Sequence, residues 1–245
     1  MNALIEQISA ELEASSDEKT RLSGRRFFKE EIRLHGVKSA SVSSICKEYL
    51  KLVKADSKEE IFGLCEELFQ TGYFEESIIA CNWAESQSKY FTPGDFELFK
   101  RWIDTYVSNW ATCDVFCNHT MGNFIEMYPS FLAQLKRFTK SPNRWMRRAA
   151  AVSLIVPARK GLFLQDILEI ADSLLHDRDD LVQKGYGWML KVASQKHQQV
   201  ILNFVVARRA TMPRTALRYA IEKMPKDLKL IAMEKIRVDD PSSHN

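Results

Sequence analysis

Two stretches of this 245-residue sequence carry the same pattern 36 residues apart. Residues 141–148 read Ser-Pro-Asn-Arg-Trp-Met-Arg-Arg, and residues 177–184 read Asp-Arg-Asp-Asp-Leu-Val-Gln-Lys. Both begin with residues that start helices and end on a basic side chain. Steps of 34 residues extend the register forward to Arg218 and back to Asp114. An interval of 34 to 36 residues is the length of one helical hairpin, and stacked hairpins form an α-solenoid.

The composition also favours helices. The chain holds only 9 glycines and 7 prolines, fewer than the ~7% and ~5% of an average protein. Hydrophobic periodicity is helical almost throughout, and no convincing β-alternation is present. We therefore expect an all-α solenoid in which the inner helices line the surface that binds partners. One domain is predicted over residues 1–237, with a flexible tail over residues 238–245.

Several helix boundaries can be predicted. Asp17 is expected to cap a helix that runs to about His35, where Gly36 supplies the stop. Ser57 is expected to begin another helix. Further starts are predicted at Thr92-Pro93, Ser141-Pro142, Asp177–Asp180 and Met212-Pro213.

Other features exclude whole classes of function. No secretory signal and no apolar run of membrane-spanning length are found, and phosphate-binding loops, Rossmann fingerprints, HExxH, GxSxG and paired CxxC motifs are absent. The 5 cysteines show no disulfide pattern, so a reducing cytoplasm is expected. Cys113 and Cys117 share a helix face and could hold a metal, but without a second ligand pair they are better interpreted as packing residues. No metal, cofactor or membrane partner is expected, and nothing indicates an obligate oligomer, so a monomer is predicted.

Charge is divided unevenly along the chain. Residues 1–128 hold 14 basic and 21 acidic side chains, a net charge of −7, whereas residues 129–245 hold 21 and 11, a net charge of +10. Two windows, 129–163 and 195–221, contain no acid. Such windows favour phosphate recognition, because each neutralised phosphate releases counterions. A generic basic face and a docking site for an acidic protein remain alternatives. The basic residues of the first window are Lys136, Arg137, Lys140, Arg144, Arg147, Arg148, Arg159 and Lys160.

Two tryptophans and one acid fall among these basic residues. Trp110 and Asp114 are spaced i, i+4, and Trp188 follows Lys184 by one turn. Indole faces and a carboxylate both attract cations, and a carboxylate can stabilise an oxocarbenium-like transition state or position water. The spacing alone favours the alternative interpretation, in which both tryptophans are core residues and Asp114 is paired with an arginine.

A family resemblance bears on this choice. The motifs Trp110-x3-Asp114, Trp145-x2-Arg148-Ala-Ala and Gln183-Lys-Gly-x-Gly-Trp188 together resemble the AlkD-type DNA alkylation repair glycosylases. The segment from Phe27 to Val37 is similar to the end of that family's N-terminal helix and the turn after it. The resemblance covers residues from about 20 to about 225.

The resemblance implies HEAT-like repeats that hold duplex DNA on a basic concave face, and hydrolysis of cationic N3- or N7-alkylpurines without base flipping. It implies that Asp114 acts as the catalytic acid between Trp110 and Trp188, and that Arg148 contacts DNA. Phe27 would frame the lesion, and Lys184 would hold a phosphate. Weaker phosphate candidates are Arg144, Arg147, Lys191, Arg214 and Arg218.

The sequence departs from the family pattern at two positions. Phe27 stands where the family has a tyrosine, and Asn109 stands where its best-known pattern has another tryptophan. These departures leave the preferred alkyl group and the tolerance of bulky adducts open. A non-catalytic binder of branched or distorted DNA in the same superfamily and a HEAT-type protein-interaction scaffold are the alternative functions.

Overall fold

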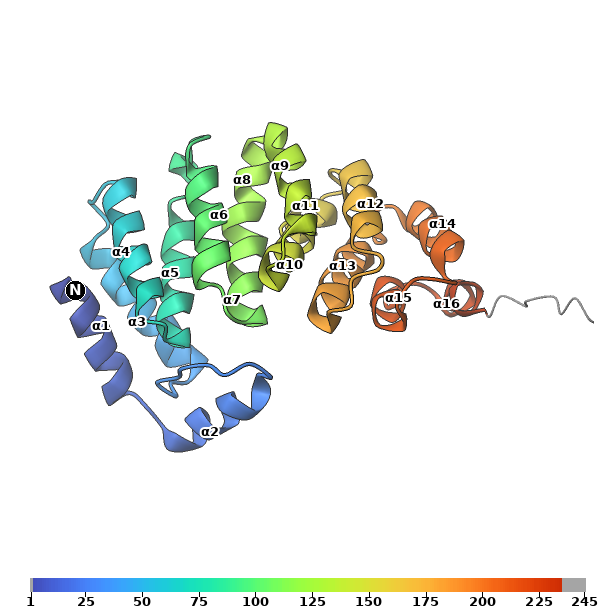
Figure 1. Cartoon of the computed structure of the whole chain (residues 1–245). Coiled ribbons are helices and arrows are strands. Elements are labelled where there is room, and N and C mark those ends of the chain that lie inside the picture. The colour runs from blue at the N-terminus through green and yellow to red at the C-terminus, as the bar shows by residue number, and fades with distance from the viewer. Residues whose placement is uncertain (1, 235–245) are drawn as a thin grey trace, which may run out of the picture. The chain divides into compact units, whose positions relative to one another are not determined.

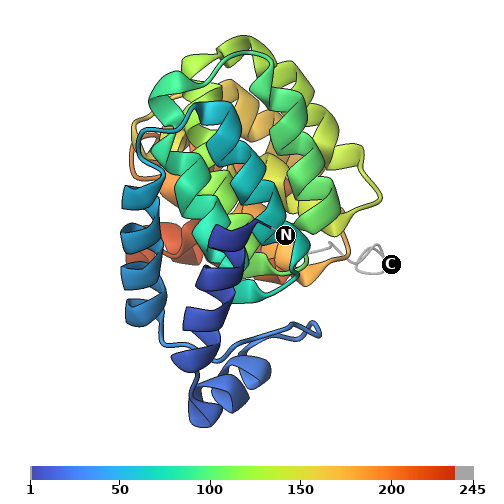
Figure 2. The same cartoon turned by 90° about the vertical axis from the view of Figure 1, so that its left-hand side faces the viewer.

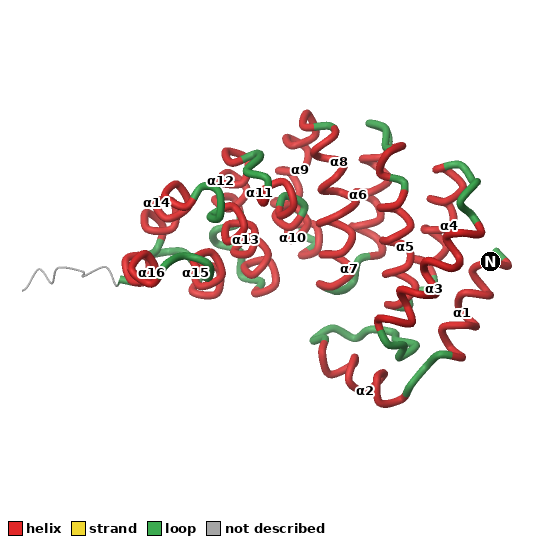
Figure 3. Tube along the Cα trace, turned by 180° about the vertical axis from the view of Figure 1, so that it is seen from behind, coloured by secondary structure: helices red, strands yellow, loops and turns green. Residues whose placement is uncertain are grey.

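The computed structural model describes residues 2–234, which form helices joined by turns and contain no β-strand (Figures 1 and 3). The predicted all-α fold of helical hairpins is confirmed. The chain divides into two compact units, Met1–Ala149 and Ala150–Asn245. A single domain over residues 1–237 stays a prediction, and the predicted tail over residues 238–245 lies outside the described residues. No helix among the described residues is long and apolar enough to cross a membrane.

The first unit consists of successive helices packed around an aromatic core. Helix α5 packs against α3, α4 and α7. The core of this unit includes four almost completely buried aromatic side chains: Trp83, Phe99, Trp102 and Phe116. The helices are α1 (Ala3–Ala14), α2 (Glu18–Phe27), α3 (Ser39–Leu52), α4 (Lys58–Gln70), α5 (Phe74–Ser86), α6 (Asp95–Tyr106), α7 (Trp110–Val115), α8 (Gly122–Met127), α9 (Leu132–Arg137) and α10 (Arg144–Val152). A π-helical segment, η2 (Phe116–Met121), joins α7 to α8, and the short 3-10 helices are η1 (Ser88–Tyr90), η3 (Pro129–Phe131) and η4 (Phe138–Lys140). The division between the units falls within α10.

The second unit is built around α13. This helix packs against α11, α12 and α15, while α14 packs against α16. The elements are α11 (Ile155–Arg159), α12 (Leu164–Ser173), α13 (Asp180–Ala193), α14 (Gln198–Arg208), α15 (Arg214–Ile221) and α16 (Lys226–Met233).

Most of the predicted helix starts agree with the structure. Ser57 forms a capping box with Glu60 at the start of α4. Asp179 caps α13 through the backbone N–H groups of its first turn. Helices α6, α10 and α15 each begin one or two residues after the prolines that predicted them.

The predicted C-terminal end of the helix that Asp17 caps, at about His35, is wrong. Asp17 caps α2 as expected, but α2 stops at Phe27. The chain then turns so that Phe28 packs against Phe74 and Trp110, and this burial outweighs continuation of the helix. Gly36 lies in the returning segment with φ +86°, and a Cβ there would come within 2.6 Å of Arg21 Cβ.

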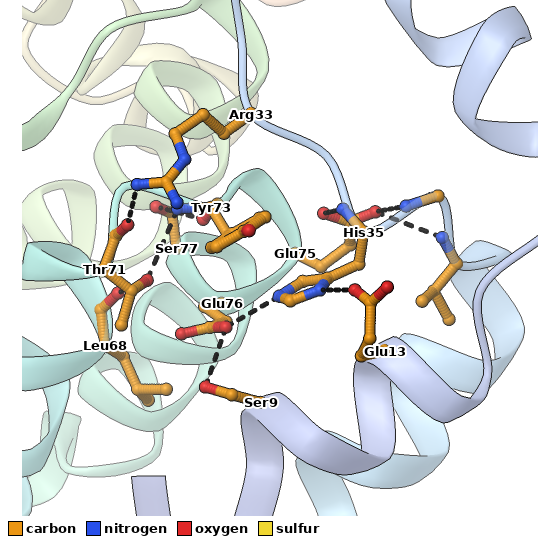
Figure 4. Close-up of polar contacts among 12 residues, drawn as sticks. Ser9, Glu13, Arg33, His35, Leu68, Thr71, Tyr73, Glu75, Glu76 and Ser77 are labelled. Atoms are coloured by element: carbon orange, nitrogen blue, oxygen red, sulfur yellow. Dashed lines mark hydrogen bonds and ion pairs between the residues drawn. The ribbon is translucent and has the colours of Figure 1, made fainter. Parts of the chain in front are cut away.

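Helix α2 has no buried residues, and Figure 2 shows it at the bottom of the view, below α1. Polar contacts anchor the segment that follows it (Figure 4). The Glu75 carboxylate accepts hydrogen bonds from three successive backbone N–H groups: His35 at 3.1 Å, Gly36 at 2.8 Å and Val37 at 3.1 Å. The His35 ring stacks on Tyr73 with centroids 3.9 Å apart. These contacts fix the segment against the N-terminal end of α5.

The His35 ring also links α1 to α5. Its Nδ1 lies 3.0 Å from Glu13 Oε2, and its Nε2 lies 2.7 Å from Glu76 Oε1. Burial lowers the pKa of His35, but hydrogen bonds to Glu76 and Glu13, with the charges of Glu76 and Glu75, outweigh it and raise that pKa above its usual value. When protonated, the ring donates to both carboxylates at once.

Replacing His35 by Gln is expected to remove a pH-dependent part of the stability. Because the folded-state pKa lies above the unfolded one, the stabilisation is fully present below about pH 6.5 and is lost as pH rises through the folded pKa. The variant should be roughly 1–3 kcal/mol less stable than wild type at pH 6, with a smaller difference at pH 9. Urea unfolding of both proteins from pH 5.5 to 9 measures this difference. A difference that does not change with pH contradicts the assignment of the proton to His35.

Candidate functional site

Helix α7 begins with Trp110 and carries Asp114 one turn later. Asn109 has an extended backbone, and its side chain accepts a hydrogen bond of 2.9 Å from the Thr112 N–H. This is the geometry of a helix N-cap, and an asparagine serves it well. Asn109 is buried, with 3% of its surface exposed, so its departure from the family pattern has a local structural role.

Trp110 belongs to a small aromatic cluster that the sequence predicted in part. Its ring centroid lies 5.3 Å from that of Phe27 and 5.8 Å from that of Phe28. Phe28 is buried against Phe74, whereas Phe27 is 66% exposed and Trp110 is half-buried. The structure thus brings two predicted site residues, Phe27 and Trp110, into contact and leaves aromatic surface available to a ligand.

A cavity with both basic and acidic walls adjoins this aromatic cluster. It has a volume of about 760 Å³, and Phe27, Phe28 and Ala111 form part of its wall. Its charged lining residues are Lys19, Arg26, Lys38, Asp17 and Glu75.

Asp114 is paired with Arg148 in a bidentate salt bridge. Arg148 Nε donates to Asp114 Oδ1 at 2.8 Å, and Arg148 Nη2 donates to Oδ2 at 2.7 Å. Both residues are buried, with 9% and 5% of their surfaces exposed. The two residues that the 34-residue register predicted to be equivalent are therefore in direct contact between α7 and α10.

Burial and pairing act in opposite directions on Asp114. Burial raises the pKa of its carboxyl, and the hydrogen bonds and charge of Arg148 oppose that rise only in part. Burial lowers the pKa of the Arg148 guanidinium, but the contacts with Asp114 outweigh it and raise that pKa. A carboxylate has about four lone-pair sites, and Arg148 occupies two of them, so Asp114 keeps capacity to accept hydrogen bonds from water.

The other two predicted arginines of α10 also have partners within the first unit. Arg144 Nη1 donates to Glu30 Oε1 at 2.9 Å. Arg147 Nη1 donates to the carbonyl oxygens of Ser141 and Pro142 at 3.0 and 2.9 Å. Their phosphate contacts stay predictions, and a phosphate would have to compete with these internal acceptors.

The remaining predicted residues belong to the second unit. Trp188 is half-buried on α13, and Lys184 contacts Asp180 at 3.1 Å on the same helix. Lys191 contacts Glu222 at 3.0 Å. Arg214 and Arg218 are exposed on α15. That these side chains share one DNA-binding surface with Asp114 stays a prediction.

The family model for DNA alkylation repair enzymes matches residues 8–224 of the chain. The chain belongs to the DNA alkylation repair enzyme family. A solved structure, a predicted DNA alkylation repair enzyme from Enterococcus faecalis, has the same fold with a TM-score of 0.77 and 17% identity, covering 86% of this chain and 98% of that chain. The sequence matches no curated protein.

Membership of the DNA alkylation repair family supports an enzymatic role in DNA repair and an α-solenoid-like fold of helical repeats. Among the described residues no group of three His, Cys, Asp or Glu side chains could hold a metal ion. Cys113 and Cys117 are fully buried, and burial raises the pKa of the Cys113 thiol well above its usual value.

Sequence reasoning missed Glu30, which contacts Arg144 of the candidate site. Its partner Arg144 is 114 residues away, so no local spacing relates them. The only signal was the position of Glu30 three residues after Phe27, within the stretch that resembles the family.

Gly187, next to Trp188, is predicted not to tolerate a side chain. A Cβ there would lie 2.7 Å from Tyr219 Cβ and 2.8 Å from the Ala216 carbonyl oxygen, because α13 and α15 pack closely. Gly187→Ala should therefore lower the free energy of unfolding by about 1–3 kcal/mol. Gly63→Ala, where a Cβ has no neighbour within 4 Å, is a matched control on α4. Urea midpoints that shift equally in both variants would contradict close packing at Gly187.

Removing Arg148 is predicted to destabilise the protein more than removing both members of its salt bridge. Arg148→Ala leaves the buried Asp114 carboxylate unpaired, which should cost about 3–5 kcal/mol. Asp114→Ala combined with Arg148→Ala removes the unpaired charge and should restore part of the loss. Urea unfolding of the two single variants and the double variant at pH 7 gives the coupling energy. A loss of unfolding free energy in the double variant that equals the sum of the two single losses would contradict a stabilising buried pair.

Proposed function

We propose that the protein is a monofunctional DNA glycosylase that hydrolyses the N-glycosidic bond of cationic N3- or N7-alkylpurines in duplex DNA and leaves an abasic site. The supporting observation is the buried pair between Asp114 of α7 and Arg148 of α10, together with the half-exposed Trp110 one turn before Asp114. It places an oriented carboxylate beside an aromatic surface, and both attract positive charge.

The chemistry needs one carboxylate and one water. As the C1′–N bond breaks, its electron pair passes to the alkylated purine, which leaves as a neutral base. Positive charge then develops on the deoxyribose, and the Asp114 carboxylate stabilises it. Water adds to C1′ and releases its proton to a free lone pair of Asp114 or to solvent.

The aromatic side chains supply contacts without an enclosed pocket. Phe27 and Trp110 expose ring surface against which the lesion nucleotide can pack while it stays in the base stack. Excision without base flipping is therefore part of the proposal. Trp188 and Lys184 of the second unit would complete the lesion contact and hold a phosphate. Additional phosphate contacts are assigned to Arg144, Arg147, Lys191, Arg214 and Arg218.

Arg148 has a double role in this proposal. Its guanidinium orients the two Asp114 oxygens, and a contact with the DNA backbone is assigned to it, as to Arg144 on the same helix. Because it is 5% exposed, Arg148 acts on DNA mainly through the carboxylate that it positions.

One observation favours a second candidate, a non-catalytic binder of branched or distorted DNA. Both Asp114 oxygens already accept hydrogen bonds from Arg148, as in a purely structural salt bridge. A protein-interaction scaffold is the third candidate, and it differs from the others in having no affinity for duplex DNA at low salt.

The wild-type protein should release 7-methylguanine and 3-methyladenine from DNA that has been treated with a methylating agent. Asp114→Asn keeps the shape of the side chain but removes its charge, so release should slow by about 100-fold or more while binding to undamaged duplex changes less than threefold. Chromatography with mass detection measures the free bases. Asp56→Asn, at an exposed position between α3 and α4, is the control.

Two results would contradict the proposal in different ways. Duplex binding without release of either base by the wild type would favour the non-catalytic binder. Undiminished release by the Asp114→Asn variant would keep the glycosylase activity and remove Asp114 from its mechanism.

A further inference from the structure

The segment after α2 contacts the candidate site at two places, through Phe27 and through Glu30. Phe27 contacts Trp110, and Trp110 lies one turn before Asp114 on α7. Figure 1 shows the end of α2 below α7, and the first residue of α7, Trp110, contacts Phe27 at the end of α2. Glu30 itself follows Phe27 by three residues on that segment.

The second contact, through Glu30, is made with α10. Glu30 contacts Arg144 at 2.9 Å, and Arg148, one turn further on α10, contacts Asp114 at 2.7 Å. Two carboxylates are thus held by guanidinium groups on successive turns of one helix. Four residues of an α-helix span about 6 Å along its axis. Glu30 and Asp114 are therefore parts of one charged arrangement.

The Glu30 carboxylate is only half satisfied. Its side chain is 17% exposed, and its Oε1 accepts a hydrogen bond from Arg144. Its Oε2 is buried and has no hydrogen-bond partner within the described part of the chain. An ionised carboxylate oxygen in this state favours any cation or donor that approaches it.

Arg144 is the more accessible member of the pair, with 43% of its side chain exposed. A DNA phosphate would recognise the same guanidinium that Glu30 now holds, because carboxylate and phosphate bind this group in the same geometry. If phosphate displaced Glu30, the carboxylate would be left half-buried and unpaired. Undamaged DNA offers nothing to offset that cost, whereas a cationic alkylpurine supplies positive charge beside the Phe27–Trp110 surface.

We propose that Glu30 is a specificity-determining residue: it competes with the DNA backbone for Arg144 and thereby weakens binding to undamaged duplex relative to duplex that carries a cationic purine. This inference rests on the proposed function, since it assumes that the aromatic surface receives the lesion. It assigns to Glu30 no part in bond cleavage.

The test compares Glu30→Gln with Glu31→Gln, which removes the same charge from the neighbouring, exposed residue. Fluorescence anisotropy measures the binding of both variants and the wild type to undamaged duplex between 50 and 300 mM salt. Glu30→Gln should bind about three- to tenfold more tightly at the lowest salt, with a salt dependence steeper by about one phosphate contact. Glu31→Gln should stay within twofold of the wild type and keep its slope.

A second measurement uses the same duplex after treatment with a methylating agent. The preference for the methylated duplex over the undamaged one should fall at least threefold in Glu30→Gln and be retained in Glu31→Gln. Adding Arg144→Gln to Glu30→Gln should abolish the gain in affinity, because the gain requires the Arg144 guanidinium. Retention of the full gain in the double variant would overturn the role of Arg144.

The outcomes separate this inference from the proposed function. Equal effects of Glu30→Gln and Glu31→Gln would overturn the inference and show a general charge effect. If the wild type prefers methylated duplex but releases no base, and Glu30→Gln loses that preference, the Glu30 assignment is supported while glycosylase activity is contradicted. Absence of duplex binding by the wild type would overturn both.

Discussion

The buried salt bridge between Asp114 and Arg148 is the interaction on which the first unit's candidate site depends. Removing two charges from water is costly, and the cost is offset only when the geometry is good and both charges stay paired. Here two hydrogen bonds, of 2.8 and 2.7 Å, satisfy that condition and join α7 to α10. The same contact fixes the direction of the Asp114 carboxylate, so stability of the helix pair and orientation of the proposed catalytic group have one physical origin.

Some acidic residues of the N-terminal half are buried and hold internal partners. Glu75 binds three backbone N–H groups, Glu76 holds His35, and Asp95 holds Lys58 in a buried pair at 2.8 Å. Each lies at a junction between segments distant in sequence. The net charge of −7 over residues 1–128 therefore includes charges that are paired in the interior and do not reach the surface.

The sequence predicted the parts of the site that depend on periodicity. The 34-residue register related Asp114 to Arg148, and pairing of Asp114 with an arginine was one of the two interpretations that the spacing allowed. The end of α2 could not be predicted, because burial of Phe28 against Phe74 overrides local helix propensity. The Glu30–Arg144 contact spans 114 residues, and only the folded path of the segment after α2 brings the two together.

The positive charges on α10 are already paired with internal acceptors. Arg144 and Arg148 each hold a carboxylate, and Arg147 binds two carbonyl groups, so none of the three is a simple free cation. A ligand with negative charge alone must displace an internal acceptor, and the net attraction is small. A ligand that carries a phosphate and a nearby positive charge can bind the guanidinium and compensate the released carboxylate together. Alkylated DNA carries both charges, which is the combination that paired charges select over an unpaired basic surface.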